Sequence, residues 1–134
     1  MLVMTIGELA RRAGVGVETV RFYQRRGLLG EPPRRPGSRR LYTAEHLKVL
    51  RFIRRCKGLG FPLKDIAPLV QLRSARSRGR GCGPLHEMVT QAIHVLDAKK
   101  QVIEMRRAAL SKMLDGCPAS GHLADCGVLA ALEE

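Results

Sequence analysis

Aromatic side chains and long apolar runs are scarce in this chain of 134 residues. It contains no Trp, three Phe and two Tyr, so the apolar side chains available for a core are mainly Leu, Ile, Val and Met. It has no apolar run of 18 residues, which argues against a transmembrane helix. Charged residues also follow too soon after the N-terminus for a signal peptide. We therefore expect a cytoplasmic protein with no membrane partner.

Acidic residues are rare in the first part of the chain. Residues 1–80 hold 19 Lys and Arg against 5 Asp and Glu, whereas residues 81–134 hold 5 against 7. Such an asymmetry favours nucleic acid as the partner of the basic part. Membrane binding is the weaker alternative, because the Arg residues have no broad apolar face opposite them. No acid–base pair, nucleophile motif or phosphate loop is present, so an enzyme is not expected.

Two short helices are predicted near the N-terminus. Thr5 and Glu8 have the spacing of a capping box, and the turn at residues 14–16 contains two Gly. A second helix over residues 17–26 is expected to end at Gly27. Two helices joined by such a turn predict a helix-turn-helix, whose second helix enters the major groove of DNA. On that second helix we expect Val20 and Phe22 to face inward and the following residues to be exposed: Glu18, Arg21, Gln24 and Arg25.

The next segment, EPPRRPGSRR at residues 31–40, predicts a wing beside the second helix. Its three Pro and one Gly exclude a helix, and its four Arg can contact phosphates. A disordered basic linker is the alternative. We expect a third helix from the N-cap Thr43 to near Gly58, with Cys56 as a half-buried structural thiol. A fourth helix to about Leu72 has Pro62 in its first turn, and a flexible basic loop follows at residues 73–84.

A long helix is predicted over residues 84–114. Its apolar residues recur every seven positions, at Val89, Leu96, Ile103 and Leu110, which is typical of a helix that packs along another helix. Cys82 and Cys117 fall on the same repeat and would lie roughly 50 Å apart along a continuous helix. They cannot then share a site within one chain. In an antiparallel pair of helices, however, Cys82 of one subunit meets Cys117 and Cys126 of the other.

These patterns predict a mainly all-α protein with four parts. Residues 1–72 form a winged helix-turn-helix DNA-binding domain, and residues 73–83 form a basic hinge that carries Cys82. Residues 84–114 form a long antiparallel coiled-coil dimerisation helix. Residues 115–134 form a short metal-binding loop and a terminal helix turn from Val128 to Leu132.

Three stretches resemble the MerR family of bacterial transcription regulators, and the resemblance covers the whole chain. They are MTIGELARRAGVGVETVRFYQRRGLL, the wing ending SRRLYTAEHL, and RFIRRCKGLGFPLKDIAPLV. The resemblance implies a homodimer that binds a palindrome in an over-long promoter spacer. Its effector-bound form bends and untwists the double-stranded DNA so that RNA polymerase can start. It also implies DNA contacts by Arg21, Tyr23, Ser38, Arg40 and Tyr42. Gln24 and Arg25 are further expected contacts, from the exposed face of the second helix. At Arg39, where relatives often have an aromatic residue, a phosphate contact replaces stacking.

The effector is inferred from Cys82, Cys117 and Cys126. This triad resembles the mercury(II) sensors of the family, in which three thiolates from both subunits hold the metal. Soft thiolates also suit lead and cadmium. Copper(I) sensors lack a thiol at the position of Cys82. Zinc sensors carry a second adjacent Cys and a loop His, whereas here Gly116 precedes Cys117. Mercury(II) is the first choice, with zinc, cadmium and lead as alternatives.

Other readings of the thiols and nearby histidines stay open. His122 is either a fourth ligand or an exposed loop residue, and His86 lies close to Cys82 in sequence. The three thiols could instead hold a zinc ion that only joins the subunits. A redox sensor with an iron–sulfur cluster is a further alternative, but it needs more closely spaced cysteines than this chain has.

Overall fold

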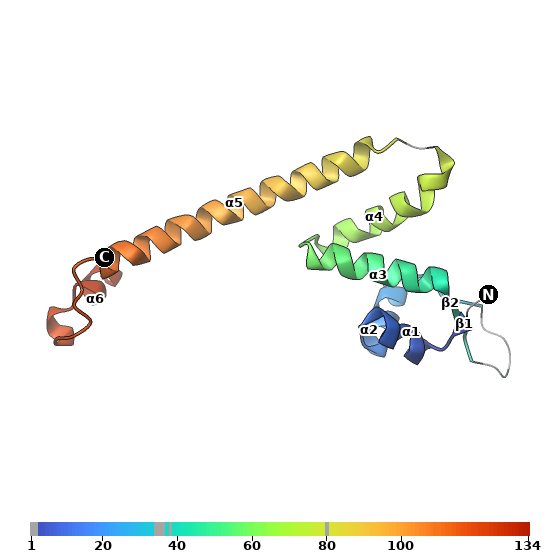
Figure 1. Cartoon of the computed structure of the whole chain (residues 1–134), viewed down its shortest axis with the longest axis horizontal. Helices are drawn as coiled ribbons and strands as arrows, with labels where there is room; N and C mark the ends of the chain where they lie inside the picture. Colours follow the sequence, from blue (N-terminus) through green and yellow to red (C-terminus); the bar gives the residue numbers. More distant parts are fainter. Residues whose placement is uncertain (1–2, 34–36, 38, 80) are drawn as a thin grey trace. The chain divides into compact units, whose positions relative to one another are not determined.

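The computed structural model describes residues 3–33, 37, 39–79 and 81–134. The chain divides into two compact units, Met1–Glu87 and Met88–Glu134, and each is treated by itself below. The elements labelled in Figure 1 follow in this order: β1 (Val3–Met4), α1 (Ile6–Ala13), α2 (Val17–Arg25), β2 (Tyr42–Thr43), α3 (Ala44–Gly58), α4 (Leu63–Ala75), the 3-10 turn η1 (Arg76–Arg78), α5 (Gly83–Leu114), η2 (Leu123–Asp125) and α6 (Gly127–Leu132). None of the described helices combines the length and the apolar character that crossing a membrane would need.

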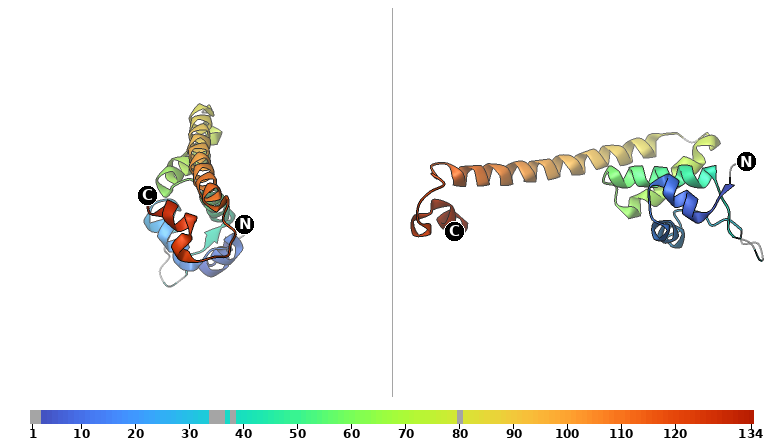
Figure 2. Two further views of the ribbon diagram at one scale, coloured as in Figure 1. Left: turned by 90° about the vertical axis from the view of Figure 1, so that its left-hand side faces the viewer. Right: turned by 60° about the horizontal axis from the view of Figure 1, so that its bottom comes forward.

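Helices α1 to α4 enclose the core of the first unit, with α3 packed against both α1 and α4 (Figures 1 and 2). The most deeply buried side chains of this unit are aliphatic, as the scarcity of aromatics predicts; they include Leu9, Val20, Leu50, Ile53 and Ile66.

Helix α1 begins as expected. The Thr5 N–H donates to Glu8 Oε2 over 2.9 Å, and the Glu8 N–H donates to Thr5 Oγ1 over 3.3 Å. This capping box satisfies two backbone donors at the start of the helix.

The turn between α1 and α2 needs glycine at position 14 for two reasons. Gly14 has φ of +72°, the left-handed conformation that ends α1. The Arg54 guanidinium also lies against it, because Arg54 Nη1 donates to the carbonyl oxygen of Ala13 over 3.0 Å. A Cβ at position 14 would displace the end of the Arg54 side chain, and with it the hydrogen bond to Ala13. The predicted helix-turn-helix is therefore present, and Arg54 ties its turn to α3.

A small antiparallel sheet accompanies the helices. Strand β1 pairs with β2 so that Val3 faces Thr43 and Met4 faces Tyr42. The sequence interpretation found only helices here, because a strand of two residues is too short to show a period-two pattern. The fold remains mainly helical, as expected. The sheet fixes the end of the wing segment beside the start of α1.

Helix α4 is longer than predicted and begins later. Pro62 is its N-cap and does not lie in its first turn, and the helix continues three residues beyond Leu72 to Ala75. The 3-10 turn η1 follows, so the expected flexible loop at residues 73–84 is wrong for its first part. Packing explains the extension: Ala75 is buried, and Arg73 Nη1 lies 2.6 Å from Glu45 Oε1 at the start of α3. This Arg73 hydrogen bond is the main reason that the pKa of Glu45 is lowered.

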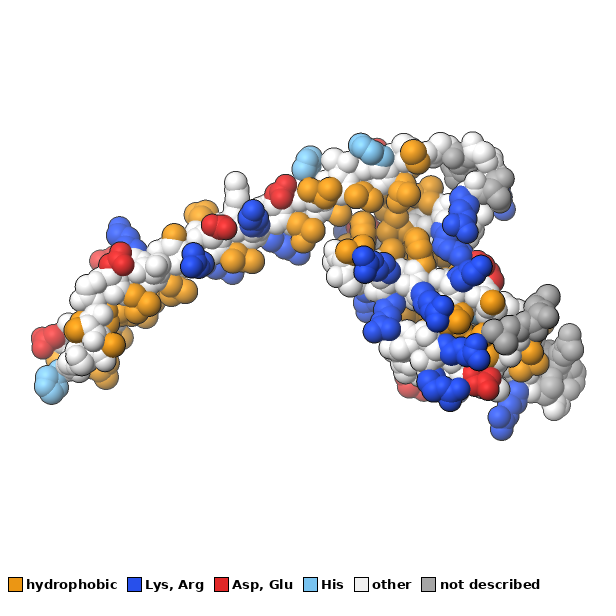
Figure 3. Space-filling view, viewed as in Figure 1, with side chains coloured by type: hydrophobic (Ala, Val, Ile, Leu, Met, Phe, Trp, Pro, Cys, Tyr) orange, Lys and Arg blue, Asp and Glu red, His pale blue; other side chains and the backbone are white. Residues whose placement is uncertain are grey.

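Helix α5 confirms the predicted long helix to within one residue at its start. Its 32 residues, all of them described, include none that is buried in the single chain. The residues of the seven-residue repeat are all exposed in the single chain: Val89, Leu96, Ile103 and Leu110 are 42%, 50%, 62% and 59% exposed. Figure 3 shows hydrophobic side chains recurring along this helix. An apolar stripe of this kind is stable in water only when another surface covers it.

Candidate DNA interface and thiol site

Helix α2 presents a polar face beside a buried one. Val20 is fully buried and Tyr23 is 3% exposed, whereas Arg21 and Arg25 are exposed. The expectation that Phe22 faces inward is wrong, because its side chain is 37% exposed and the Arg26 guanidinium lies 5.8 Å from its ring centre. Helical spacing explains why Tyr23, and not Phe22, is buried together with Val20. Residues three apart, such as positions 20 and 23, share one face of a helix.

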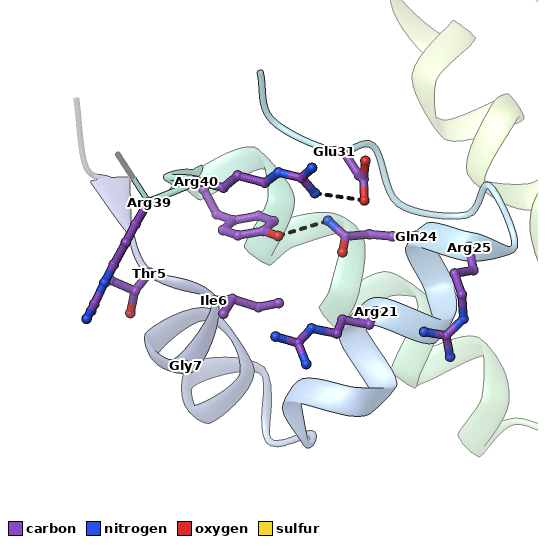
Figure 4. A pocket seen from close by; sticks show the side chains of 10 residues that line it. Thr5, Ile6, Gly7, Arg21, Gln24, Arg25, Glu31, Arg39 and Arg40 are labelled. Carbon is purple, nitrogen blue, oxygen red and sulfur yellow. Dashed lines mark hydrogen bonds and ion pairs between the residues drawn. The ribbon is translucent and has the colours of Figure 1, made fainter. Parts of the chain in front are cut away.

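A hollow of about 640 Å³ lies between α2, the start of α1 and the wing (Figure 4). Several of the predicted DNA-contacting residues line it: Arg21, Gln24, Arg25, Arg39, Arg40 and Tyr42. Thr5, Ile6, Gly7 and Glu31 also line it and were not proposed from the sequence. The predicted start of the first helix was a signal for Ile6 and Gly7, because first-turn backbone N–H groups that no cap satisfies can bind a phosphate. Nothing in the sequence singled out Glu31.

Charge in this hollow is mostly positive. Arg21 Nη1 lies 3.0 Å from Glu18 Oε1, but both side chains are more than half exposed, so this ion pair is weak and exchanges readily. Arg40 Nη1 lies 2.9 Å from Glu31 Oε1, and this contact joins the two ends of the wing segment. Ser38, a predicted DNA contact, lies outside the described residues.

Two predicted DNA contacts, Tyr23 and Tyr42, lie in the core. They are 3% and 2% exposed, respectively. The Lys57 ammonium lies 6.0 Å from the centre of the Tyr23 ring, and the Tyr42 hydroxyl accepts a hydrogen bond from Gln24 Nε2 over 3.0 Å. Both rings therefore support α2 and the wing from the protein side. Their contact with DNA stays a prediction.

The wing also depends on an imidazole at the start of α3. The Thr43 N–H donates to His46 Nδ1 over 3.0 Å, and the His46 ring meets the Tyr42 ring edge to face. Burial lowers the pKa of His46, and the nearby Glu45 carboxylate only partly opposes this effect. The neutral imidazole is thus the form that the fold requires, because a protonated Nδ1 cannot accept the Thr43 hydrogen bond.

We expect this histidine to make the first unit less stable in acid. Its pKa is lower in the folded chain than the value of about 6.5 in an unfolded one. Its contribution is therefore complete above that value and is lost as the pH falls below it. Glutamine at position 46 would keep an acceptor that does not titrate. Urea unfolding at pH 7.5 and pH 5.5 should show a smaller loss of stability for His46→Gln than for the parent protein. Equal losses would contradict this role.

The four thiols have different surroundings. Cys56 is buried, and so more deeply enclosed than the half-buried thiol that was expected, and burial raises the pKa of its thiol. Cys82 is exposed immediately before α5, and its carbonyl oxygen accepts the His86 N–H over 2.9 Å. Cys117 is exposed and Cys126 is half-buried. Of the four, Cys56 is therefore the least suited to bind metal as a thiolate.

The loop after α5 brings two of the predicted ligands to one hollow. Cys117 and Cys126 line a space of about 590 Å³ between the end of α5 and α6, and the exposed His122 lines it too. The backbone is left-handed at Gly116 and at Ala119, which folds the loop back. Within the described part of a single chain, no three His, Cys, Asp or Glu residues are grouped as a metal site.

Comparison with known proteins gives consistent similarities. Residues 4–72 match the family model described as MerR HTH family regulatory protein, and residues 47–113 match the model described as MerR, DNA binding. The chain is 38% identical to the mercuric resistance operon regulatory protein of Pseudomonas fluorescens over 133 residues, which cover 97% of this chain and 88% of the relative. It is 31% identical to the HTH-type transcriptional regulator ZntR of Escherichia coli, over 96% of this chain and 92% of the relative.

A solved structure resembles this one over nearly its whole length. It is a transcription regulator from Ralstonia metallidurans in complex with lead(II). The TM-score is 0.82 and the sequence identity is 37%, with 96% of this chain and 98% of the other covered.

Proposed function

The chain belongs to the MerR family of DNA-binding transcription regulators, and on this basis we propose that it is a metal-responsive regulator that acts at a promoter as a homodimer. In this proposal residues 1–72 bind DNA, and the segment between α4 and α5 forms the hinge that carries Cys82. Residues 84–114 form the dimerisation helix, and residues 115–134 form the metal-binding loop with the terminal helix. The observation that carries the proposal is the exposed apolar stripe of α5, which has a candidate ligand thiol next to each of its ends.

The DNA contacts in this proposal come from α2 and the wing. Arg21 and Arg25 are exposed on α2, and Arg39 and Arg40 line the same hollow from the wing. Guanidinium groups bind phosphates and guanine edges, and the glutamine amide of Gln24 suits adenine. We expect the dimer to remain on a palindromic site and to distort the duplex when its effector is bound, so that RNA polymerase can start.

The dimer is supported by the apolar stripe of α5. A helix of 32 residues is about 48 Å long, and its repeating apolar side chains are 42% to 62% exposed in one chain. Antiparallel pairing with a second copy would bury them. It would also bring the thiol before α5 of one subunit to the two loop thiols of the other, so the dimer would hold two identical sites.

Three thiolates in such a site favour a soft divalent ion. Mercury(II) is the first choice, because a relative with 38% identity is named for mercuric resistance. Lead(II) is the nearest alternative, because a regulator with 37% identity and a similar structure was solved in complex with it. Cadmium and zinc remain further candidates. His122 would supply a fourth ligand for an ion that prefers four.

Titration of the purified protein with mercury(II), lead(II), cadmium and zinc tests this function. We expect an ultraviolet thiolate-to-metal absorption band that saturates at two ions per dimer. Transcription from a promoter that carries the bound operator should rise at the lowest concentration for one of the four ions. A protein that selects no DNA sequence, or transcription that responds to none of the ions, would contradict the proposal.

A further inference from the structure

We propose that Tyr42 is a positioning residue, which holds the Gln24 amide in one orientation and so sets the base pair that α2 prefers. This inference rests on the proposed DNA-binding function. Its starting point is the hydrogen bond from Gln24 Nε2 to the Tyr42 hydroxyl, 3.0 Å long, between residues 18 positions apart in sequence. A dashed line from Gln24 marks this hydrogen bond in Figure 4, and Arg21 and Arg40 line the same hollow.

Tyr42 is a rigid support for this hydrogen bond. Its side chain is 2% exposed, and its backbone belongs to β2, where it faces Met4 of β1. The His46 ring lies at 83° to the Tyr42 ring, with the ring centres 5.2 Å apart. Packing on the ring and pairing of the backbone leave the hydroxyl one position. It therefore stands at the wall of the hollow as a fixed acceptor for the Gln24 amide.

The conformational freedom of the Gln24 side chain affects how well it can recognise a base. Gln24 is half-buried on the face of α2 that also carries Arg21, and it lines the hollow. A glutamine side chain otherwise samples many rotamers, and the amide must lie in the plane of a base to make two hydrogen bonds with adenine. One N–H of Nε2 is held by Tyr42. The second N–H and the carbonyl oxygen are then presented together, without the cost of ordering the side chain upon binding.

The residues around Tyr42 distinguish a role in positioning Gln24 from a role in binding DNA phosphates. The Tyr42 ring has almost no exposed surface for DNA, whereas the arginines of the hollow are charged and long enough to reach phosphates. Phosphate contacts raise affinity for every sequence, and only base-edge contacts distinguish sequences. If Tyr42 acts through Gln24, loss of its hydroxyl must change the preference at one base pair. If the hydrogen bond only joins the wing to α2, its loss must weaken binding to all sequences alike.

The test uses the full-length dimer and operators that differ by single base pairs in each half-site. Tyr42→Phe removes the hydroxyl and keeps the ring. We expect the ratio of affinities for the preferred and the substituted base pair to fall about tenfold at one position in each half-site, as for the loss of one good base contact. The ratios at the other positions should not change. Gln24→Met should lose preference at the same position. The double variant should be no less selective than Gln24→Met alone, because the two side chains act as one unit.

One further variant, Arg39→Gln, completes the test. Arg39→Gln is the comparison for a phosphate contact. It should weaken binding to every operator equally and reduce the slope of log affinity against log salt by about 1. Gln24→Met leaves the buried Tyr42 in place, so it reports on specificity even if Tyr42→Phe folds poorly. A uniform loss for Tyr42→Phe, or unchanged preferences for both variants, would overturn the positioning role. A parent protein with no preferred operator would instead overturn the proposed function itself.

Discussion

Replacing Ile103 with glutamate is expected to convert the dimer into monomers that bind neither the operator nor the metal with the affinity of the parent protein. Ile103 lies at the middle of the apolar stripe and is 62% exposed in the single chain. Burying an isoleucine contributes about 1.5–3 kcal/mol, and each dimer would bury two copies. A carboxylate at the interface adds its own desolvation cost. Dimer dissociation should therefore become at least roughly 100-fold easier.

Sedimentation at micromolar concentration measures this change. Gln101→Glu is the matched control, because it introduces the same carboxylate on an exposed residue nearly opposite Ile103 around α5. The control should sediment as a dimer and the Ile103→Glu protein as a monomer. If both variants remain dimeric at the same concentration, the stripe of α5 is not the interface.

Replacing Cys82 with serine is expected to abolish the response to the metal while operator binding is preserved. Cys82 is exposed immediately before α5, in the proposed hinge, and it does not line the hollow beside α2 that we propose to bind DNA. A serine hydroxyl is a poor ligand for a soft ion, so the proposed centre would lose one of its three strong ligands. We expect the affinity for the ion to fall by more than the roughly 10- to 100-fold typical of losing an outer-shell partner.

The thiolate-to-metal absorption band and promoter-driven transcription report on this loss together. Cys56→Ala is the control, because Cys56 is buried in the first unit and is not a proposed ligand. That variant should lose some stability but keep the response to the metal. A mercury response that survives in Cys82→Ser would mean that the two loop thiols are sufficient.

Local signals in the sequence were enough for much of this fold. The capping box at Thr5, the glycine turn after α1 and the long helix α5 are each present as predicted, because each follows from residues that are close in sequence. The β1–β2 pairing and the extension of α4 were missed because they depend on contacts between distant parts of the chain. Neither a two-residue strand nor the Arg73–Glu45 ion pair leaves a periodic pattern.

The candidate sites were less predictable than the fold. Residue type identified the arginines and thiols, but the inward-facing position was assigned to Phe22, whereas Tyr23 occupies it. The hydrogen bond between Gln24 and Tyr42 joins residues 18 positions apart, and Glu31 meets Arg40 across the wing. Such contacts depend on how the wing folds onto α2. Residue identity alone therefore suggests which side chains have suitable chemistry but not which of them meet.

Mixed dimers can show whether each metal centre is shared between two subunits. One subunit carries Cys82→Ser, the other carries Cys117→Ser and Cys126→Ser, and different affinity tags allow the mixed dimer to be purified after co-expression. Neither variant alone can form a three-thiolate centre. If the centre is shared as proposed, Cys82 of one subunit would meet the two loop thiols of the other at one end of the mixed dimer only. We predict one tightly bound ion per mixed dimer, with the absorption band restored to half its parental strength. A mixed dimer that binds the ion no better than the Cys82→Ser homodimer or the Cys117→Ser, Cys126→Ser homodimer would contradict the shared centre.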